Sequence, residues 1–306
     1  MVNYIGFGKS YDITVSKTQN DPVTTTSDCG CDLGPGSPYI VSSSPSTYST
    51  SIDGIVGNRP PNISLDIPTP PIKCVFPCLS PLIGKIGKNS FYIGFGGSTG
   101  ASTNEHWLHN VTWNSSLNSL SYSDILNNSN YLNDAIKIGN SVRFTQAGND
   151  QTGNIFYTTP IYFLDSNSNL LNWSCYYVFS MGGGSRADGI TFILQSYSNI
   201  AGGFGGGLAY DGIPNSVAVG YDSYQNYFDP NNNHIEIDVN GSVSSSLITF
   251  TPPFNMCGNT GTNKYIYNWV DYTSGVLKIY TSESNTKPST PYISYSIDLK
   301  DYLIVA

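Results

Sequence analysis

Charge is scarce in this chain of 306 residues. Asp, Glu, Lys and Arg make up only 11% of it, against roughly 25% in ordinary soluble domains. Lys and Arg together number 13, and the formal net charge is -8. The clustered cations that nucleic-acid binding requires are therefore missing, and we exclude that class of function.

Long apolar runs are missing as well. No stretch of about 18 apolar residues occurs, so we expect no membrane insertion. The first residues, MVNYIGFGKSYDITVSK, lack a basic start followed by an apolar stretch, and no signal peptide is visible. The polar, nearly uncharged composition nevertheless favours an extracellular location or the surface of a particle, either a virion or a cell.

Cysteines are few but even in number. The six are Cys29, Cys31, Cys74, Cys78, Cys175 and Cys257. The spacings CGC and CVFPC are not metal-binding C-x-x-C pairs and prolines flank them, so disulfide bonds are favoured over a metal site and over free thiols. Cys175, inside the strand-like WSCYYVF, fits a buried free thiol equally well.

Composition divides the chain near residue 115. Residues 1–115 contain Pro-, Ser- and Gly-rich segments and predict a loop-rich arm or small assembly region that contains strands. YIGFGKS at 4–10 recurs as YIGFGGS at 92–98, either by coincidence or as two like strands that pair with each other or with neighbouring subunits. EHWLH at 105–109 is interpreted as an exposed polar linker, and its H-x-x-H is only a weak zinc signal.

Residues 116–306 show short segments of alternating polar and apolar residues, rich in β-branched and aromatic side chains and separated by turn signals. Examples are SVRFTQA, WSCYYVFSM, GITFILQSY and KYIYNWVDY. No comparable run keeps a helical period. The fold class is therefore all-β, and so many antiparallel strands predict two stacked sheets in a jelly-roll β-sandwich.

The segment from Val217 to Gly241 gathers ligand-type side chains in one predicted hairpin. Asp222, Asn226 and Asp229 offer the oxygen atoms that Ca2+ prefers. His234 follows them, and an imidazole suits a neighbouring transition metal such as Mn2+. The alternative is a polar hairpin whose Asp and Asn side chains only bond to their own backbone.

Three segments in order resemble the legume-type (L-type) lectins, especially their bacterial branch. They are ADGITFILQ at 187–195, GGFGGGLAYDGI at 202–213 and SVAVGYDSYQNYFDPNNNHIEIDVNG at 216–241. The resemblance covers residues 118–306. It implies a concanavalin-like sandwich and a calcium-dependent protein that binds glycans or glycoproteins without catalysis.

The resemblance also assigns roles to residues. It implies Ca2+ ligands at Asp222, the main-chain carbonyl of Tyr224, Asn226 and Asp229, and a second metal at Asp222, Asp229 and His234. The sugar-binding residues it implies are Asp188, which follows a cis peptide bond in the family, Gly206 with Gly207, Tyr224 and Asn226.

One pair of positions departs from the family pattern. The family has Glu where this chain has Gly220, and a small residue where this chain has Glu236. If Asp222 faces His234 across the hairpin, the antiparallel register also places Gly220 opposite Glu236. We expect Glu236 to restore the second metal site, the alternative being a solvated side chain and calcium alone.

Glycosidase chemistry is not expected. The segment IEIDVNG is similar to the catalytic strand of jelly-roll glucanases, which carries two carboxylates four residues apart. Here the residue four positions after Glu236 is Asn240, and an amide cannot donate the catalytic proton. The chain is therefore not expected to be an enzyme.

Two expectations concern assembly. The family's domains continue with a GFSA-like strand, a fourth sugar loop and a closing strand, whereas this sequence ends at Ala306. The N-terminal region, another subunit or further residues are expected to complete the sheet, and an open edge would favour a homo-oligomer or larger assembly through the N-terminal region. The competing interpretation is a structural coat, fibre or filament subunit, for example of a large virus.

Overall fold

The computed structural model describes residues 13–17, 48–52, 89–197 and 199–303. The chain divides into two compact units, residues 1–85 and 86–306. In the first unit the structure describes one antiparallel pair, β1 (Ile13–Lys17) and β2 (Tyr48–Ile52). The first copy of the repeated heptapeptide and the first four cysteines lie outside the described residues.

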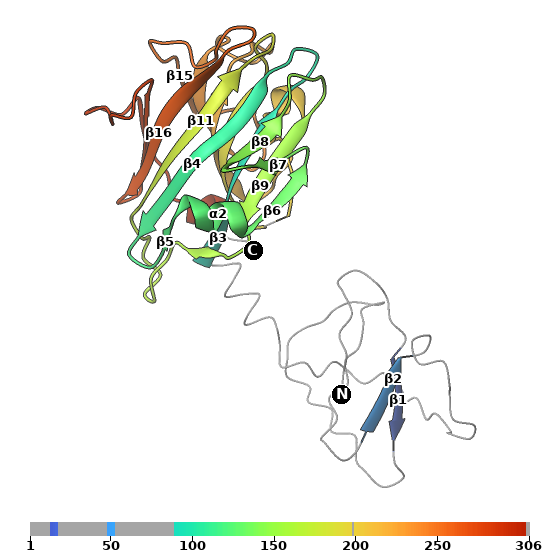
Figure 1. Ribbon diagram of the computed structural model, residues 1–306. Coiled ribbons are helices and arrows are strands. Elements are labelled where there is room, and N and C mark those ends of the chain that lie inside the picture. The colour runs from blue at the N-terminus through green and yellow to red at the C-terminus, as the bar shows by residue number, and fades with distance from the viewer. Residues whose placement is uncertain (1–12, 18–47, 53–88, 198, 304–306) are drawn as a thin grey trace. The chain divides into compact units, whose positions relative to one another are not determined.

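The second unit is a sandwich of two antiparallel sheets, which confirms the all-β prediction (Figure 1). The front sheet runs, in spatial order, β15 (Ile248–Phe250), β14 (His234–Val239), β13 (Ser216–Asp222), β12 (Gly189–Gln195), β3 (Ser90–Ser98), β9 (Thr152–Tyr157) and β6 (Ser129–Asn133), with β10 (Ile161–Tyr162) beside β3. The back sheet runs β18 (Ile293–Ser296), β17 (Val276–Ser282), β16 (Asn263–Thr273), β11 (Trp173–Gly182), β4 (Glu105–Ser115), β8 (Ser141–Thr145) and β7 (Ile136–Ile138), with β5 (Ser119–Leu120) beside β4. The short helices are α2 (Tyr122–Asn127), α3 (Lys300–Leu303) and the 3-10 turn η1 (Gly205–Gly207).

The core between the sheets is rich in aromatic side chains. Trp113 of β4 stacks on Trp173 of β11 with ring centroids 4.5 Å apart, and Trp173 stacks in turn on Tyr272 of β16 at 5.7 Å. Cys175 and Cys257 are buried and free. Of the two interpretations of Cys175, the buried free thiol is therefore correct, and no disulfide is present among the described residues.

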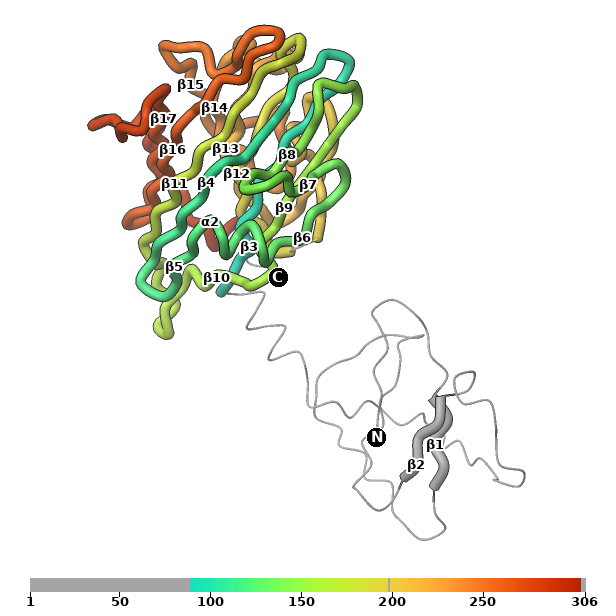
Figure 2. The backbone as a smooth tube through the Cα atoms, in the orientation of Figure 1, coloured from blue at the N-terminus to red at the C-terminus, as the bar shows by residue number. Residues whose placement is uncertain are grey.

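β3 and β4 correct the predicted division at residue 115. β3 pairs with β12 on one side and β9 on the other, and β4 lies between β11 and β8 (Figure 2). The compact unit thus begins at residue 86, not 116. Two strands that precede the segment resembling a lectin thus lie inside the two sheets.

The second copy of the repeated heptapeptide, residues 92–98, is the body of β3 and lies in the middle of the front sheet. EHWLH is not a linker, because it opens β4. His106 faces the core with its Nδ1 2.7 Å from Thr145 Oγ1. His109 occupies an irregularity of the pairing with β11, where Ser141 and Ser180 contact its two ring nitrogens.

A second, smaller core covers the outer face of the front sheet. Ile193 of β12 and Ala218 of β13 pack there against three residues of the loop that joins these strands, Leu208, Tyr210 and Ile213. Both faces of the central strands are therefore buried, and the covering loop carries the glycine-rich segment toward the end of β13.

Candidate functional site

The β13–β14 hairpin brings the metal-type side chains together. Asp222, the last residue of β13, is paired with His234, the first of β14, and Gly220 is paired with Glu236. The register predicted from the sequence is therefore confirmed. Tyr221 and Ile235, which alternate with these four residues along the strands, enter the main core. The four residues therefore lie on the outer face of the sheet.

Three side chains on this hairpin converge. Ligand atoms of Asp222, Asp229 and His234 all lie within 4.8 Å of one another. The connecting loop is held by its own carboxylates, because Tyr224 N donates to Asp222 Oδ1 at 2.7 Å and Asn226 N donates to Asp229 Oδ2 at 2.6 Å. The side-chain-to-backbone hydrogen bonds expected of a merely polar hairpin are thus present. Each of them uses one carboxylate oxygen, so the other oxygen of Asp222 and of Asp229 takes no part in them.

His234 is fixed in a geometry suited to a ligand. Its Nδ1 lies 2.8 Å from the Asn231 carbonyl oxygen, so Nδ1–H donates there and Nε2 points toward the carboxylates. Nε2 is buried and lies 3.9 Å from Asp229 Oδ1 and 3.4 Å from Glu236 Oε2. Burial lowers the pKa of His234, but Glu236 and Asp229 outweigh this effect and raise the pKa above its ordinary value.

Glu236 is buried and points toward His234 rather than into solvent. The Glu236 side chain lies over Gly220. A Cβ atom on Gly220 would be 2.8 Å from Glu236 Cγ and 2.8 Å from Glu236 Oε1. Its Oε2 accepts a hydrogen bond from Ser246 Oγ at 2.7 Å. The solvated interpretation of Glu236 is therefore wrong.

Asp238 is a further carboxyl group that the sequence interpretation missed. It lies two residues after Glu236 on the same strand, which places both side chains on one face, and this alternation was the signal that could have identified it. Asp238 is fully buried. Burial, followed by the negative charge of Glu236, raises its pKa well above the ordinary value.

When no cation is close, ionised carboxyl groups on the hairpin destabilise the folded protein. Burial raises the pKa of Asp222 well above its ordinary value, and Asp229, Glu236 and Asp188 raise it further. Burial also raises the pKa of Asp229. A cation among these oxygens would offset both desolvation and mutual repulsion, because an opposite charge favours the ionised form.

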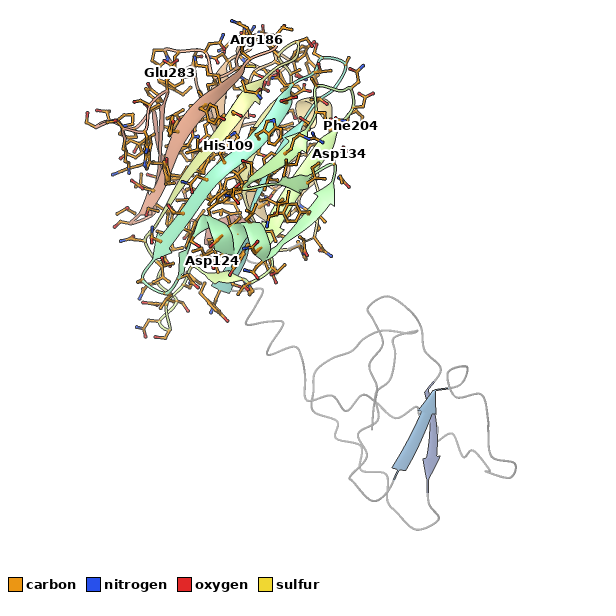
Figure 3. All side chains as sticks on the ribbon, in the orientation of Figure 1. His109, Asp124, Asp134, Arg186, Phe204 and Glu283 are labelled. Carbon is orange, nitrogen blue, oxygen red and sulfur yellow. The ribbon has the colours of Figure 1, made fainter. Side chains whose placement is uncertain are left out.

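Asp188 lies at the same end of the sandwich, immediately before β12, and Arg186 marks this end in Figure 3. The Ala187–Asp188 peptide bond is cis, as the resemblance implied. Burial raises the pKa of the Asp188 carboxyl to about 7. Its Oδ2 is buried without a hydrogen-bond partner, and a Cβ on Gly100, in the β3–β4 loop, would lie 3.4 Å from it.

The glycine loop and the metal loop meet at Gly206 and Asn226. A Cβ on Gly206 would overlap Asn226 Nδ2 at 2.2 Å, so a larger residue here would displace the Asn226 side chain. Asn226 Oδ1 is buried and lacks a partner. Tyr224, which follows the end of β13, is 42% exposed, whereas Gly207 lies inside the 3-10 turn.

The residues present fit the metals that the fold implies. Asp222 and Asp229 supply carboxylate oxygens, Asn226 Oδ1 is a buried amide oxygen that lacks a partner, and His234 Nε2 is a buried imidazole nitrogen that lacks one. Carboxylate, amide and carbonyl oxygens suit Ca2+, and imidazole with carboxylates suits Mn2+. Asn226 Oδ1 and His234 Nε2 are both buried without a hydrogen-bond partner, as expected of ligand positions.

A two-sheet sandwich with an acidic, amide-rich loop at the end of its front sheet defines the concanavalin-like class. The profile of the family described as "Legume lectin domain" matches residues 118–305, more than half of the chain. The chain belongs to this family. The match begins after β3 and β4, which the structure adds to the same sandwich.

Comparisons with known proteins gave three similarities. The lectin domain-containing receptor kinase VIII.1 of Arabidopsis thaliana is 31% identical over 170 residues, which are 51% of this chain and 23% of the kinase. Agglutinin-2 of Cladrastis kentukea is 31% identical over 49% of this chain and 55% of its own length. The solved winged bean acidic lectin, in complex with methyl-alpha-D-galactose, is 24% identical over 57% of this chain and 78% of that chain, with a TM-score of 0.44.

The alignments cover limited parts of these proteins. The chain spans about a quarter of the length of the receptor kinase and just over half of the length of the agglutinin. Among the described residues, no helix is both long enough and apolar enough to cross a membrane.

Proposed function

We propose that this protein is a calcium-dependent lectin that binds glycans or glycoproteins and does not catalyse a reaction. The observation that carries the proposal is the buried, unpartnered Oδ2 of Asp188 beside the glycine loop. A carboxylate oxygen held without a partner at the rim of a sandwich is suited to accept hydrogen bonds from ligand hydroxyl groups.

The sugar site would combine this carboxylate with its neighbours. Asn226 would bind both calcium and sugar, and the backbone N–H of Gly206, with Gly207 beside it, would donate to a hydroxyl group. The exposed ring of Tyr224 would cover the apolar face of the sugar. The close contact between Gly206 and Asn226 supports this arrangement, because it joins the two loops at one point.

Calcium would be held by Asp222, the carbonyl of Tyr224, Asn226 and Asp229. It would fix the loop that carries Asn226 and Tyr224. A second ion, such as Mn2+, would be held by Asp222, Asp229, His234 and Glu236. The support for Glu236 is its position 3.4 Å from His234 Nε2 over the side-chain-free Gly220.

We also propose multivalent display at a cell or particle surface. β3 ends at Ser98, which pairs with Gly189 beside the site, whereas it begins at Ser90, about 26 Å away at the rise of an extended strand. β3 therefore begins at the end of the strand remote from the site. Self-association through residues 1–85 would let many weak sugar sites bind together.

The test is a glycan array probed with the recombinant protein, with calcium and again with excess chelator, alongside metal analysis of the same sample. We expect chelator-sensitive binding and calcium in the purified protein. Bound calcium without binding to any glycan would contradict the sugar site, and glycan binding unaffected by chelator would contradict the role of calcium.

A further inference from the structure

A row of side chains crosses the outer face of the back sheet. Along it, Ile136 of β7 pairs with Arg143 of β8, Arg143 with Trp107 of β4, Trp107 with Ser180 of β11, and Ser180 with Tyr265 of β16. These five strands are consecutive neighbours in the sheet (Figure 1). At the usual spacing of neighbouring strands the row is about 19 Å long. Residues next to it in the chain enter the core, which places the row on the outer face; they are Leu108, Val142, Phe144, Phe179, Met181 and Ile266.

His109 closes the gap that the small Ser180 would leave in this row. Its Nε2 lies 2.8 Å from Ser180 Oγ. Its ring centroid is 4.7 Å from that of Tyr265 and 6.4 Å from that of Trp107, whose ring is nearly parallel to it. The guanidinium carbon of Arg143 is 5.7 Å from the centre of the Trp107 ring. The row is thus a continuous surface of three aromatic rings and one cation, with His109 in its middle (Figure 3).

Both ends of the row are open to solvent. Tyr265 is 50% exposed, Ile136 is 41% exposed, and Ile138, on the same face of β7, is 40% exposed. They are three of the eight large apolar or aromatic side chains that are exposed among the described residues. The back sheet therefore carries an apolar patch on the sheet opposite the metal hairpin.

Two cations at one end of the row have no carboxylate partner. Arg143 takes part in none of the ion pairs of the described residues, and its Nε is buried without a hydrogen-bond partner. Lys137 Nζ donates to the uncharged amide of Asn127 at 2.8 Å. Glu105 Oε2 accepts two side-chain hydrogen bonds, and Asp134 Oδ2 accepts one from the backbone of the front sheet. In a chain with a net charge of -8, these two cations are left for an anion from outside the chain.

The place of the row in the sheet restricts what can bind there. β16, β11, β4 and β8 each pair with a neighbour on both sides, so they offer no free edge to a peptide strand. A second copy packed face to face would bring Arg143 and Lys137 of both chains into one contact, and like charges in an interface are unfavourable. The partner must instead combine apolar faces for the rings with anionic groups for the cations.

We propose that this row is a second binding site, which takes a polysaccharide that carries carboxylate groups, as uronic acid units do. The sugar rings stack their C–H faces on Tyr265 and Trp107, and the carboxylates bind Arg143 and Lys137. The site shares no residue with the proposed sugar site and contains no proposed metal ligand. It therefore works without calcium.

The test compares the binding of the full chain to polygalacturonate and to the same polymer with its carboxyl groups reduced to alcohols. Both are immobilised and measured by biolayer interferometry at low salt with excess chelator, which inactivates the proposed sugar site. Wild type is expected to bind the acidic polymer at least about 10-fold more tightly than the reduced one. The preference should shrink as the salt concentration rises.

Variants assign the binding to the row. Arg143→Gln and the exposed Lys137→Gln are each expected to weaken polygalacturonate binding about 10-fold, and Tyr265→Ala about 3- to 10-fold. Lys278→Gln is the matched control for charge, because Lys278 lies on the outer face of β17, in the same sheet but outside the row. Tyr162→Ala, an exposed ring of the front sheet, is the control for Tyr265→Ala.

Four results would overturn the inference. They are equal binding of the two polymers, equal binding in all three cation variants, loss of polygalacturonate binding in Asp188→Asn, and a dimer in sedimentation that Tyr265→Ala dissociates. The third would place the polymer at the front-sheet site, and the fourth would make the row an interface between two copies. A glycan array without any binding would contradict the proposed function and leave this second site standing.

Discussion

Glu236 fills the space that a side chain on Gly220 would occupy. The two residues are direct partners across β13 and β14, and a Cβ on Gly220 would come within 2.8 Å of Glu236 Cγ. One carboxylate therefore fits at this pair of positions, and it can be supplied from either strand. The chain carries it on β14.

The first prediction exchanges the two residues. Glu236→Gln should reduce the metal content from two ions per chain to one, because the second ion loses a charged ligand. The double variant Gly220→Glu/Glu236→Gly should restore two ions, because the carboxylate returns from the opposite strand. Elemental analysis and the electron paramagnetic resonance spectrum of added Mn2+ would measure both.

Gly220→Glu alone is the control for the exchange. It should be destabilised by about 1–3 kcal/mol, since two side chains then compete for one space. Two ions in Glu236→Gln, or one ion in the double variant, would contradict the assignment of Glu236 to the second site.

The second prediction concerns Asp188. Asp188→Asn should lower glycan affinity by at least about 10-fold, because hydrogen bonds to a charged acceptor are worth about 1.5–3 kcal/mol. Metal content should not change. Isothermal titration of the best array glycan would measure the affinity, and Asp211→Asn, at the exposed end of the glycine loop, is the matched control. Loss of metal together with sugar would show that Asp188 acts on the fold instead.

The third prediction concerns pH. Burial raises the pKa of Asp188 to about 7 and also raises the pKa values of Asp222 and Asp229, so the ion-free site keeps protons to a higher pH than ordinary carboxyl groups do. A raised carboxyl pKa means that the native state binds more protons than the unfolded chain, and its stability falls as pH rises from 4 toward 7. Cations must displace these protons.

The increase in Tm caused by calcium should therefore be largest near pH 7.5 and shrink steadily toward pH 5. Differential scanning fluorimetry with calcium and with chelator, at each pH, isolates this difference from other titrating groups such as His106, whose pKa burial lowers to about 3. A calcium effect that is constant from pH 5 to pH 7.5 would contradict the raised pKa values.

The fourth prediction concerns chain boundaries. A chain that begins at residue 118, where the family match begins, lacks β3 and β4 and should fail to form a cooperative fold. A chain that begins at residue 86 keeps both sheets complete and should unfold with nearly the Tm of the full protein. A cooperative transition in the shorter chain would show that these two central strands are dispensable.

The register of the metal hairpin was predictable from the sequence, because Asp222 and His234 fix it and an antiparallel pair then determines every other partner. The predicted boundary at residue 115 was wrong because the packing of β3 against distant strands is not visible in the sequence. Strand β3 is rich in glycine, which is typical of loops. In the structure, Cβ atoms on Gly94 and Gly96 would overlap the Phe156 ring and the Asn154 side chain.

Contacts of this kind depend on strands that are distant in sequence, and one sequence does not reveal them. The same limit applies to Asp238. Its alternation with Glu236 places it on the outer face of β14, but only the covering second core shows that it is buried. The roles of Asp188, Gly206, Tyr224 and Asn226 came from the resemblance and stay predictions.

The position of β3 and β4 has a consequence for synthesis of the protein. These strands leave the ribosome before their main partners, because β12 pairs with residues 92–98 of β3 and β11 pairs with β4. These two strands of the sheet interiors are thus made before their main partners, and the pairings β3–β12 and β4–β11 join segments that are far apart in the chain. Such long-range pairing is slow, so the edges of β3 and β4 stay unpaired until the later strands have been made.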